Sequence, residues 1–275
     1  MVHPQIAAFA RLAKENTPPV RTLEGQKTLI SRTMHGFGYD AVHDEIVVTG
    51  PLTQAILIFR GGANGEEPPL RVIQGPHTQI LGTGYGGLDR VSVDGVHGEI
   101  YLPVSTGQIL VFPREANGDV APKRVLNGAR GAITVDPVHD LLIVNGRDSM
   151  AIYDRTASGD AKPKAVIQGP QSRVAGLNTV QVLPSKGLVI GGCDRARHPS
   201  VTNAVCAWSI TDNGNVPPRW AIPIQASTGG YQASGIALDP VHKEIIISAP
   251  GEKEDGRPPD GTVNNILTFS WPEIF

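Results

Sequence analysis

The chain has 275 residues, a formal net charge of −2 and 40% hydrophobic residues, which is enough to bury a large core. The near-neutral charge argues against nucleic-acid binding, which needs a clustered basic surface. No apolar run approaches the roughly 20 residues that cross a bilayer, so no membrane span is expected.

Residues 1–16 lack the basic, apolar and small-residue pattern of a secretory signal. The compartment is therefore unknown, and an extracytoplasmic location stays open if the N-terminus is trimmed. Two strand-like runs follow at 6–10 and 18–23. The second resembles the last strand of the repeat described below, and we expect it to pair with the C-terminal repeat. The first is then a surplus strand.

A short turn sequence repeats along the chain. Its clearest copy, Val-Asp-Gly-Val-His-Gly-Glu-Ile, occupies residues 93–100. The other copies lie at 39–46, 135–142 and 238–245, with a degenerate one at 182–189. Their spacing, about 40 to 55 residues, is the period of propeller blades.

Each copy lies within a unit of four short strands rich in Val and Ile, separated by Gly, Pro, Asn and Asp. We call them a to d, with the repeated turn between a and b. No segment sustains a capped helical period, apart from an ambiguous stretch at 5–15. The sequence therefore predicts one all-β domain over 1–275, a β-propeller of five blades with four antiparallel strands each, closed by 18–23. The expected blade cores are 36–73, 89–127, 131–168, 177–222 and 234–271.

The Val-Asp-Pro-x-His-x-Glu-Ile turn and the Ile-x-Val-Phe-x-Arg-x-Ala-x-Gly-x-x-x-Pro segment resemble those of NHL-type propeller repeats. The resemblance covers essentially the whole chain and is weakest over 188–218. It implies the fold and does not select an activity, because such propellers include ligand scaffolds as well as metal-dependent hydrolases and lyases.

Residues that recur in every blade are assigned to the scaffold. Histidines occupy the a–b turn of four blades, and we expect their side chains to bond local backbone. The Asp of each turn is read likewise as turn chemistry. These residues are His43, His97, His139 and His242, with Asp40, Asp94, Asp136 and Asp239.

The two cysteines, Cys193 and Cys206, flank a loop between two strand-like runs. They either form a disulfide that staples this hairpin or remain two unpaired thiols.

The d–a and b–c loops, which emerge together at one end of the blades, vary in length and hold the chain's non-repeated polar residues. We call this end the loop face. A divalent ion (Ca, Zn or Mg) is one candidate ligand, held by His35, Asp89 and Asn178 at the start of strands a. Further candidates are His77, His198 and Tyr85 as acid or base, and Arg90, Arg147, Asp148, Asp194, Arg195, Arg197, Tyr231 and Ser234 as ligand-binding residues.

Two functions remain open. The first is a binding propeller that holds a small molecule or a protein partner on the loop face. The alternative is a divalent-metal-dependent hydrolase or lyase, in which Arg195 or Arg197 holds an anionic substrate. The sequence matches no catalytic set of the related propeller enzymes, since no Glu starts a strand a, and it leaves open whether the chain is an enzyme.

Overall fold

The computed structural model describes residues 5–31, 36–50, 52–81, 90–175, 179–195, 202–223, 235–249 and 265–275. The chain divides into two compact units, Met1–Asn127 and Gly128–Phe275, and each is described by itself. Throughout the described part the helical segments are three 3₁₀ turns, Gln26–Thr28, Pro76–Thr78 and Pro184–Lys186. None of these segments is long and apolar enough to span a membrane.

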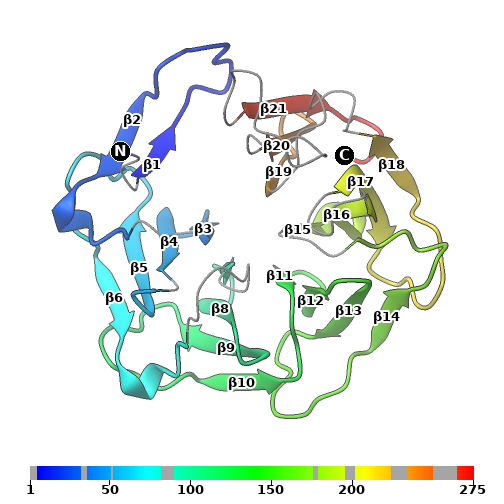
Figure 1. The fold of residues 1–275 in the computed structure, drawn as a ribbon, viewed down its shortest axis with the longest axis horizontal. Helices are drawn as coiled ribbons and strands as arrows, with labels where there is room; N and C mark the ends of the chain where they lie inside the picture. The colour runs from blue at the N-terminus through cyan, green and yellow to red at the C-terminus, as the bar shows by residue number, and fades with distance from the viewer. Residues whose placement is uncertain are drawn as a thin grey trace. The chain divides into compact units, whose positions relative to one another are not determined.

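The first unit contains a two-stranded hairpin and two four-stranded antiparallel blades (Figure 1). The hairpin is β1 (Gln5–Ala8) and β2 (Arg21–Glu24). Blade 1 consists of β3 (Gly36–Asp40), β4 (Glu45–Gly50), β5 (Ala55–Arg60) and β6 (Arg71–Gln74). Blade 2 consists of β7 (Ser92–Asp94), β8 (Glu99–Val104), β9 (Gln108–Pro113) and β10 (Arg124–Asn127).

The second unit contains three blades, of which the last has three strands in the described part. Blade 3 consists of β11 (Ala132–Asp136), β12 (Leu141–Asn145), β13 (Ser149–Asp154) and β14 (Ala165–Gln168). Blade 4 consists of β15 (Val180–Leu183), β16 (Leu188–Arg195), β17 (Thr202–Ser209) and β18 (Trp220–Pro223). Blade 5 consists of β19 (Gly235–Asp239), β20 (Glu244–Ala249) and β21 (Asn265–Ser270).

These blades make the chain an all-β, five-bladed β-propeller, as the repeat predicts. The expected pairing of residues 18–23 with the last blade is wrong. β2 pairs with β1 instead, in the register that joins strands c and d of the complete blades: Ile6 lies opposite Leu23 as Ile56 lies opposite Ile73. The surplus strand is therefore strand c of a half-blade whose strand d is β2.

The half-blade is fixed to blade 1 by a contact that recurs along the chain. A strand d forms a parallel bridge with a glycine in the c–d turn of the next blade, as at Leu23↔Gly65, Ile73↔Gly118 and Ile167↔Gly214. The three glycines have φ of 63°, 79° and 79°, the left-handed region in which a side chain is strained. The c–d turns thus serve to attach one blade to its neighbour.

Apolar side chains fill the spaces between adjacent blades within each unit. Between blades 3 and 4 the core includes Ile143, Met150 and Trp208 together with both cysteines. Cys193 and Cys206 form a disulfide, which selects the stapled hairpin over the free thiols. Both cysteines are fully buried, so the bridge lies within this core.

Candidate functional site

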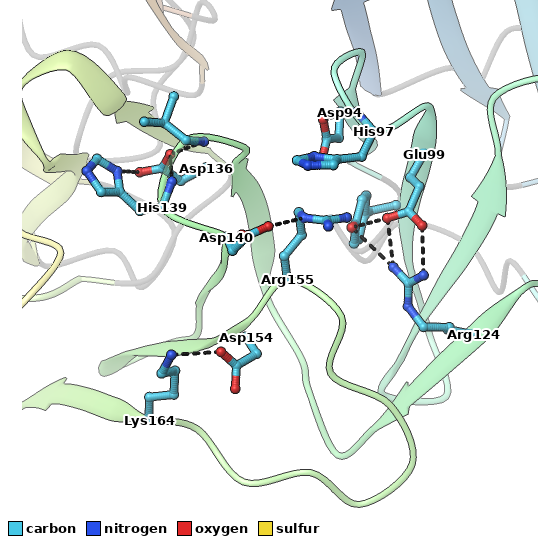
Figure 2. A network of polar contacts seen from close by, with 12 residues as sticks. Asp94, His97, Glu99, Arg124, Asp136, His139, Asp140, Asp154, Arg155 and Lys164 are labelled. Atoms are coloured by element: carbon cyan, nitrogen blue, oxygen red, sulfur yellow. Dashed lines mark hydrogen bonds and ion pairs between the residues drawn. The ribbon is translucent and has the colours of Figure 1, made fainter.

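The Asp and His of the a–b turns are scaffold residues. In the turn after β11, Asp136 Oδ1 accepts hydrogen bonds from the backbone N–H groups of Val138 (3.0 Å) and His139 (3.1 Å). Its Oδ2 lies 2.7 Å from His139 Nδ1 (Figure 2). The histidine therefore bonds the carboxylate and not the local backbone that we expected. Similar Asp–His pairs, with separations of 2.7 to 2.8 Å, form in the turns of blades 1, 2 and 5.

Blades 1 and 2 add an ion pair beside this turn. The first residue of strand b is Glu45 in blade 1 and Glu99 in blade 2, and an arginine of strand d binds each carboxylate: Arg71 at 2.7 Å and Arg124 at 2.7 Å. Burial alone would raise the pKa of both glutamates. Hydrogen bonds from the arginines outweigh it and lower the pKa below the ordinary value.

Among the described residues, one group of carboxylates and an imidazole lies close enough together to hold a metal ion. In blade 5, ligand atoms of Asp239, His242 and Glu244 lie within 4.8 Å of one another. The same sequence, Asp-x-x-His-x-Glu, occurs in blades 1 and 2. Because it recurs as a turn motif, we assign this group to the scaffold.

Most sequence-predicted site residues lie outside the described part of the chain. They include all three predicted metal ligands, so the described structure does not test whether these ligands lie close together. The residues concerned are His35, Asp89, Asn178, Tyr85, His198, Arg197, Tyr231 and Ser234.

His77 lies after β6 and contacts the c–d turn of blade 2. Its Nδ1 is 2.6 Å from Asp119 Oδ2, and its backbone N–H donates to Oδ1 at 2.8 Å. Burial would raise the pKa of Asp119, and the bonds from His77 lower it instead. Gln26 and Gln171 make the matching backbone contact to Glu66 and Asn215. The position of His77 is thus explained by blade attachment, and its catalytic role stays a prediction.

The remaining predicted residues gather mainly on the loop face of blades 3 and 4. Asp194, near the end of β16, accepts hydrogen bonds from Arg173 Nε (2.8 Å) and Nη2. Its backbone N–H also donates to the Arg173 carbonyl at 3.1 Å. Arg195 ends β16, and Arg147 and Asp148 lie in the turn after β12. Arg90, half-buried before β7, lies in the other unit.

A buried amide lies beneath this part of the loop face. Asn145, the last residue of β12, is 1% exposed, and neither Oδ1 nor Nδ2 has a hydrogen-bond partner among the described residues. Leaving one such group unsatisfied costs about 1–3 kcal/mol, so both atoms need a partner that the described residues do not supply.

A glycine of blade 4 lies opposite this amide. A Cβ built on Gly191 of β16 would lie 3.6 Å from Asn145 Nδ2, an ordinary contact. The third residue after the start of strand b is a large buried apolar residue in every other blade: Val48, Leu102, Val144 and Ile247. Glycine at this position removes a side chain that would otherwise face Asn145.

Asn145 is not among the site residues predicted from the sequence. Aligned by the strand registers, its counterparts in the other blades are Thr49, Pro103, Gly192 and Ser248. The signal was a unique Asn in one blade combined with a unique Gly one position earlier in the next. Both are visible when the repeats are aligned, but their contact arises only from blade packing.

Comparisons with known proteins support the architecture alone. No family model matches the chain, and no curated protein matches its sequence. Among solved structures, hydrazine synthase of Kuenenia stuttgartiensis is similar with a TM-score of 0.56 and 12% sequence identity. The match covers 86% of this chain and 63% of that one. At this identity the likeness shows a shared propeller fold and says nothing about chemistry.

Proposed function

We propose that this chain is a binding propeller that holds a small polar ligand on the loop face, between blades 3 and 4. The observation that carries the proposal is the buried Asn145 amide, whose donor and acceptor lack partners in the described part of the chain. A ligand with one acceptor and one donor, such as an amide or a protonated carboxyl group, would satisfy both atoms.

The two ends of the blades have different structural roles, and this difference supports the location on the loop face. The a–b turns are occupied by Asp–His pairs, and the c–d turns attach neighbouring blades. The loop face is the end that this repeated scaffold leaves variable.

Blade 4 provides a firm wall for such a site. β16 and β17 each have eight residues, against five or six in the corresponding strands of the other blades. The Cys193–Cys206 disulfide staples this longer hairpin, and Trp208 Nε1 donates to the Ser172 carbonyl at 3.1 Å. A rigid wall lowers the entropy lost on binding.

Saturation-transfer NMR with a fragment set of primary amides, carboxylic acids and lactones tests the proposal. We expect amides or carboxylic acids to bind, and Asn145→Leu to lower their affinity by about tenfold or more because two hydrogen bonds are lost. Asn16→Leu, the same substitution at an exposed site, serves as the control. Equal binding to the wild type and Asn145→Leu would reject the assignment.

Chelation separates this proposal from the metal-dependent hydrolase or lyase. Fragment binding at Asn145 is expected to persist in EDTA, because no carboxylate or imidazole takes part in it. Loss of binding in EDTA, with an ion recovered from the wild type and not from a His35→Ala variant, would favour the alternative.

A further inference from the structure

Two aromatic side chains on β3, Phe37 and Tyr39, are exposed in the first unit. Their exposed fractions are 63% and 55%. In the other blades, the residue at the place of Phe37, three positions before the end of strand a, is aliphatic and 2% to 8% exposed. These counterparts are Val91, Ile133, Val180 and Ile236. A large ring therefore lies on the surface at a position that belongs to the core elsewhere.

The half-blade explains this exposure. The cross-strand partners of Phe37 and Tyr39 on β4 are Val48 and Ile46. Both partners pack in one core with Leu23 of β2, so the two rings lie on the face of blade 1 that the half-blade covers. The half-blade contains strands c and d, and it attaches at the c–d turn of blade 1, away from β3. Strands a and b, which would cover the two rings, are missing from this two-stranded sheet.

The missing strand b also leaves Arg21 without its usual partner. Arg21 occupies the place on strand d of Arg71 and Arg124. In blades 1 and 2 each of these arginines binds the glutamate that begins strand b. The half-blade has no such glutamate, and the half-buried Arg21 side chain has no ion-pair partner among the described residues. It is therefore a cation available to a carboxylate from outside.

Arg21 lies close to the aromatic pair. The Tyr39 hydroxyl donates to Asp44 Oδ1 at 2.7 Å, and the Asp44 carbonyl accepts the N–H of Gly61. A Cβ built on the next residue, Gly62, would lie 3.6 Å from Arg21 Nη1. The bond to Asp44 raises the pKa of Tyr39, and the charge of Arg21 opposes this rise. The guanidinium and the Tyr39 ring thus lie at the same turn of blade 1.

We infer that the surface formed by Arg21, Phe37 and Tyr39 binds a small aryl carboxylate. The carboxylate binds Arg21, as the glutamates of strand b bind the arginines of the complete blades. The aryl ring packs on the two aromatic side chains in place of the missing strands. An arylpropionate suits this surface, because its flexible spacer lets the ring and the carboxylate reach both features. This site is independent of the one proposed at Asn145.

Fluorine NMR with a fluorinated phenylpropionate tests this site on the full chain. All measurements use an Asn145→Leu parent, so that the other proposed site cannot contribute. We expect saturable binding that falls about tenfold with Arg21→Gln, because a charge-assisted hydrogen bond is lost. Phe37→Ala should weaken binding about fivefold. Lys27→Gln and Leu52→Ala, which change an exposed lysine and an exposed leucine of the same unit, should bind as the parent does.

The uncharged amide of the probe separates the carboxylate from the ring. It should bind the parent about tenfold more weakly than the acid. The variants should keep the melting temperature of the parent, because Phe37 is exposed and Arg21 makes no ion pair with the described residues. The inference is overturned if the acid does not bind, if acid and amide bind alike, or if Arg21→Gln binds the acid as the parent does. It is also overturned if Phe37→Ala clearly lowers the melting temperature, because another part of the chain would then cover the ring.

Discussion

Arg124 donates a hydrogen bond to each carboxylate oxygen of Glu99, with Nη1–Oε1 at 2.7 Å and Nη2–Oε2 at 2.8 Å (Figure 2). Lys123 Nζ donates to the same carboxylate at 2.9 Å, and the Tyr101 hydroxyl donates to it at 2.7 Å. The glutamate side chain is 3% exposed, so the pair is buried and shielded from solvent. Burial alone would raise the pKa of Glu99, but these donors lower it well below its ordinary value.

Acid should therefore destabilise the protein partly through Glu99. Because the folded pKa lies below the unfolded one, the stabilisation is present above about pH 4.3 and is lost as pH falls through the folded pKa. Denaturant unfolding from pH 6 to pH 3 should show a steeper loss in the wild type than in Glu99→Gln. Equal slopes would contradict this account. Glu273→Gln, at an exposed site, should behave as the wild type.

The contribution of each Asp–His pair to the free energy of unfolding should increase with the burial of its aspartate side chain. Asp136 and Asp239 make equivalent turn bonds, but their side chains are 0% and 23% exposed. Removing the carboxylate leaves the turn N–H groups without an acceptor, and water replaces it more easily at Asp239. We expect Asp136→Ala to cost about 2 kcal/mol or more and Asp239→Ala less. Denaturant titration measures both, and a larger loss at Asp239 would refute the ranking.

Reduction should weaken the second unit. The disulfide joins cysteines 13 residues apart and lies in the core between blades 3 and 4. Closing a loop of this size stabilises a protein by about 3 kcal/mol. The melting temperature of the wild type should fall in dithiothreitol. A Cys193→Ala/Cys206→Ala variant should have a lower melting temperature than the oxidised wild type, and dithiothreitol should not change it. An unchanged wild-type melting temperature in reductant would show that the bridge contributes nothing.

The ligand-free protein should tolerate the loss of Asn145. Both polar atoms of its amide are buried without partners in the described part of the chain, so Asn145→Leu replaces unsatisfied groups with an apolar side chain of similar size. We expect the free energy of unfolding to stay level or rise by about 1 kcal/mol. A clear loss of stability would instead make Asn145 a structural residue and weaken the proposed site.

Much of the fold could be predicted from the sequence because every blade contains a copy of the repeat. The Asp–His turn, as at Asp136 and His139, marks four blades locally and a degenerate copy marks blade 4, so strand order and blade number were predictable. The role of β1 was not, because a strand of four residues becomes half a blade only through the contact of β2 with Gly65. The disulfide stayed open because it depends on the register that places Gly191 opposite Cys206.

The candidate site was less predictable for a related reason. Asn145 and Gly191 are ordinary residues within their own blades, and they acquire meaning as a pair only when blades 3 and 4 pack. His77, by contrast, stood out as a non-repeated histidine, although its pairing with Asp119 serves blade attachment. Residue type alone draws attention to His77. It does not reveal Asn145 and Gly191, because only their packing across two blades makes them unusual.

The most direct test of the binding site is to refill the space opposite Asn145. Gly191→Leu restores the residue type that blade 2 has at Leu102, whereas Gly191→Ala adds only a Cβ that meets ordinary contacts. With both variants verified as folded by circular dichroism, we expect the fragment selected on the wild type to bind Gly191→Ala and to lose at least about tenfold in affinity for Gly191→Leu. Wild-type affinity in Gly191→Leu would contradict the claim that the ligand lies between Asn145 and blade 4.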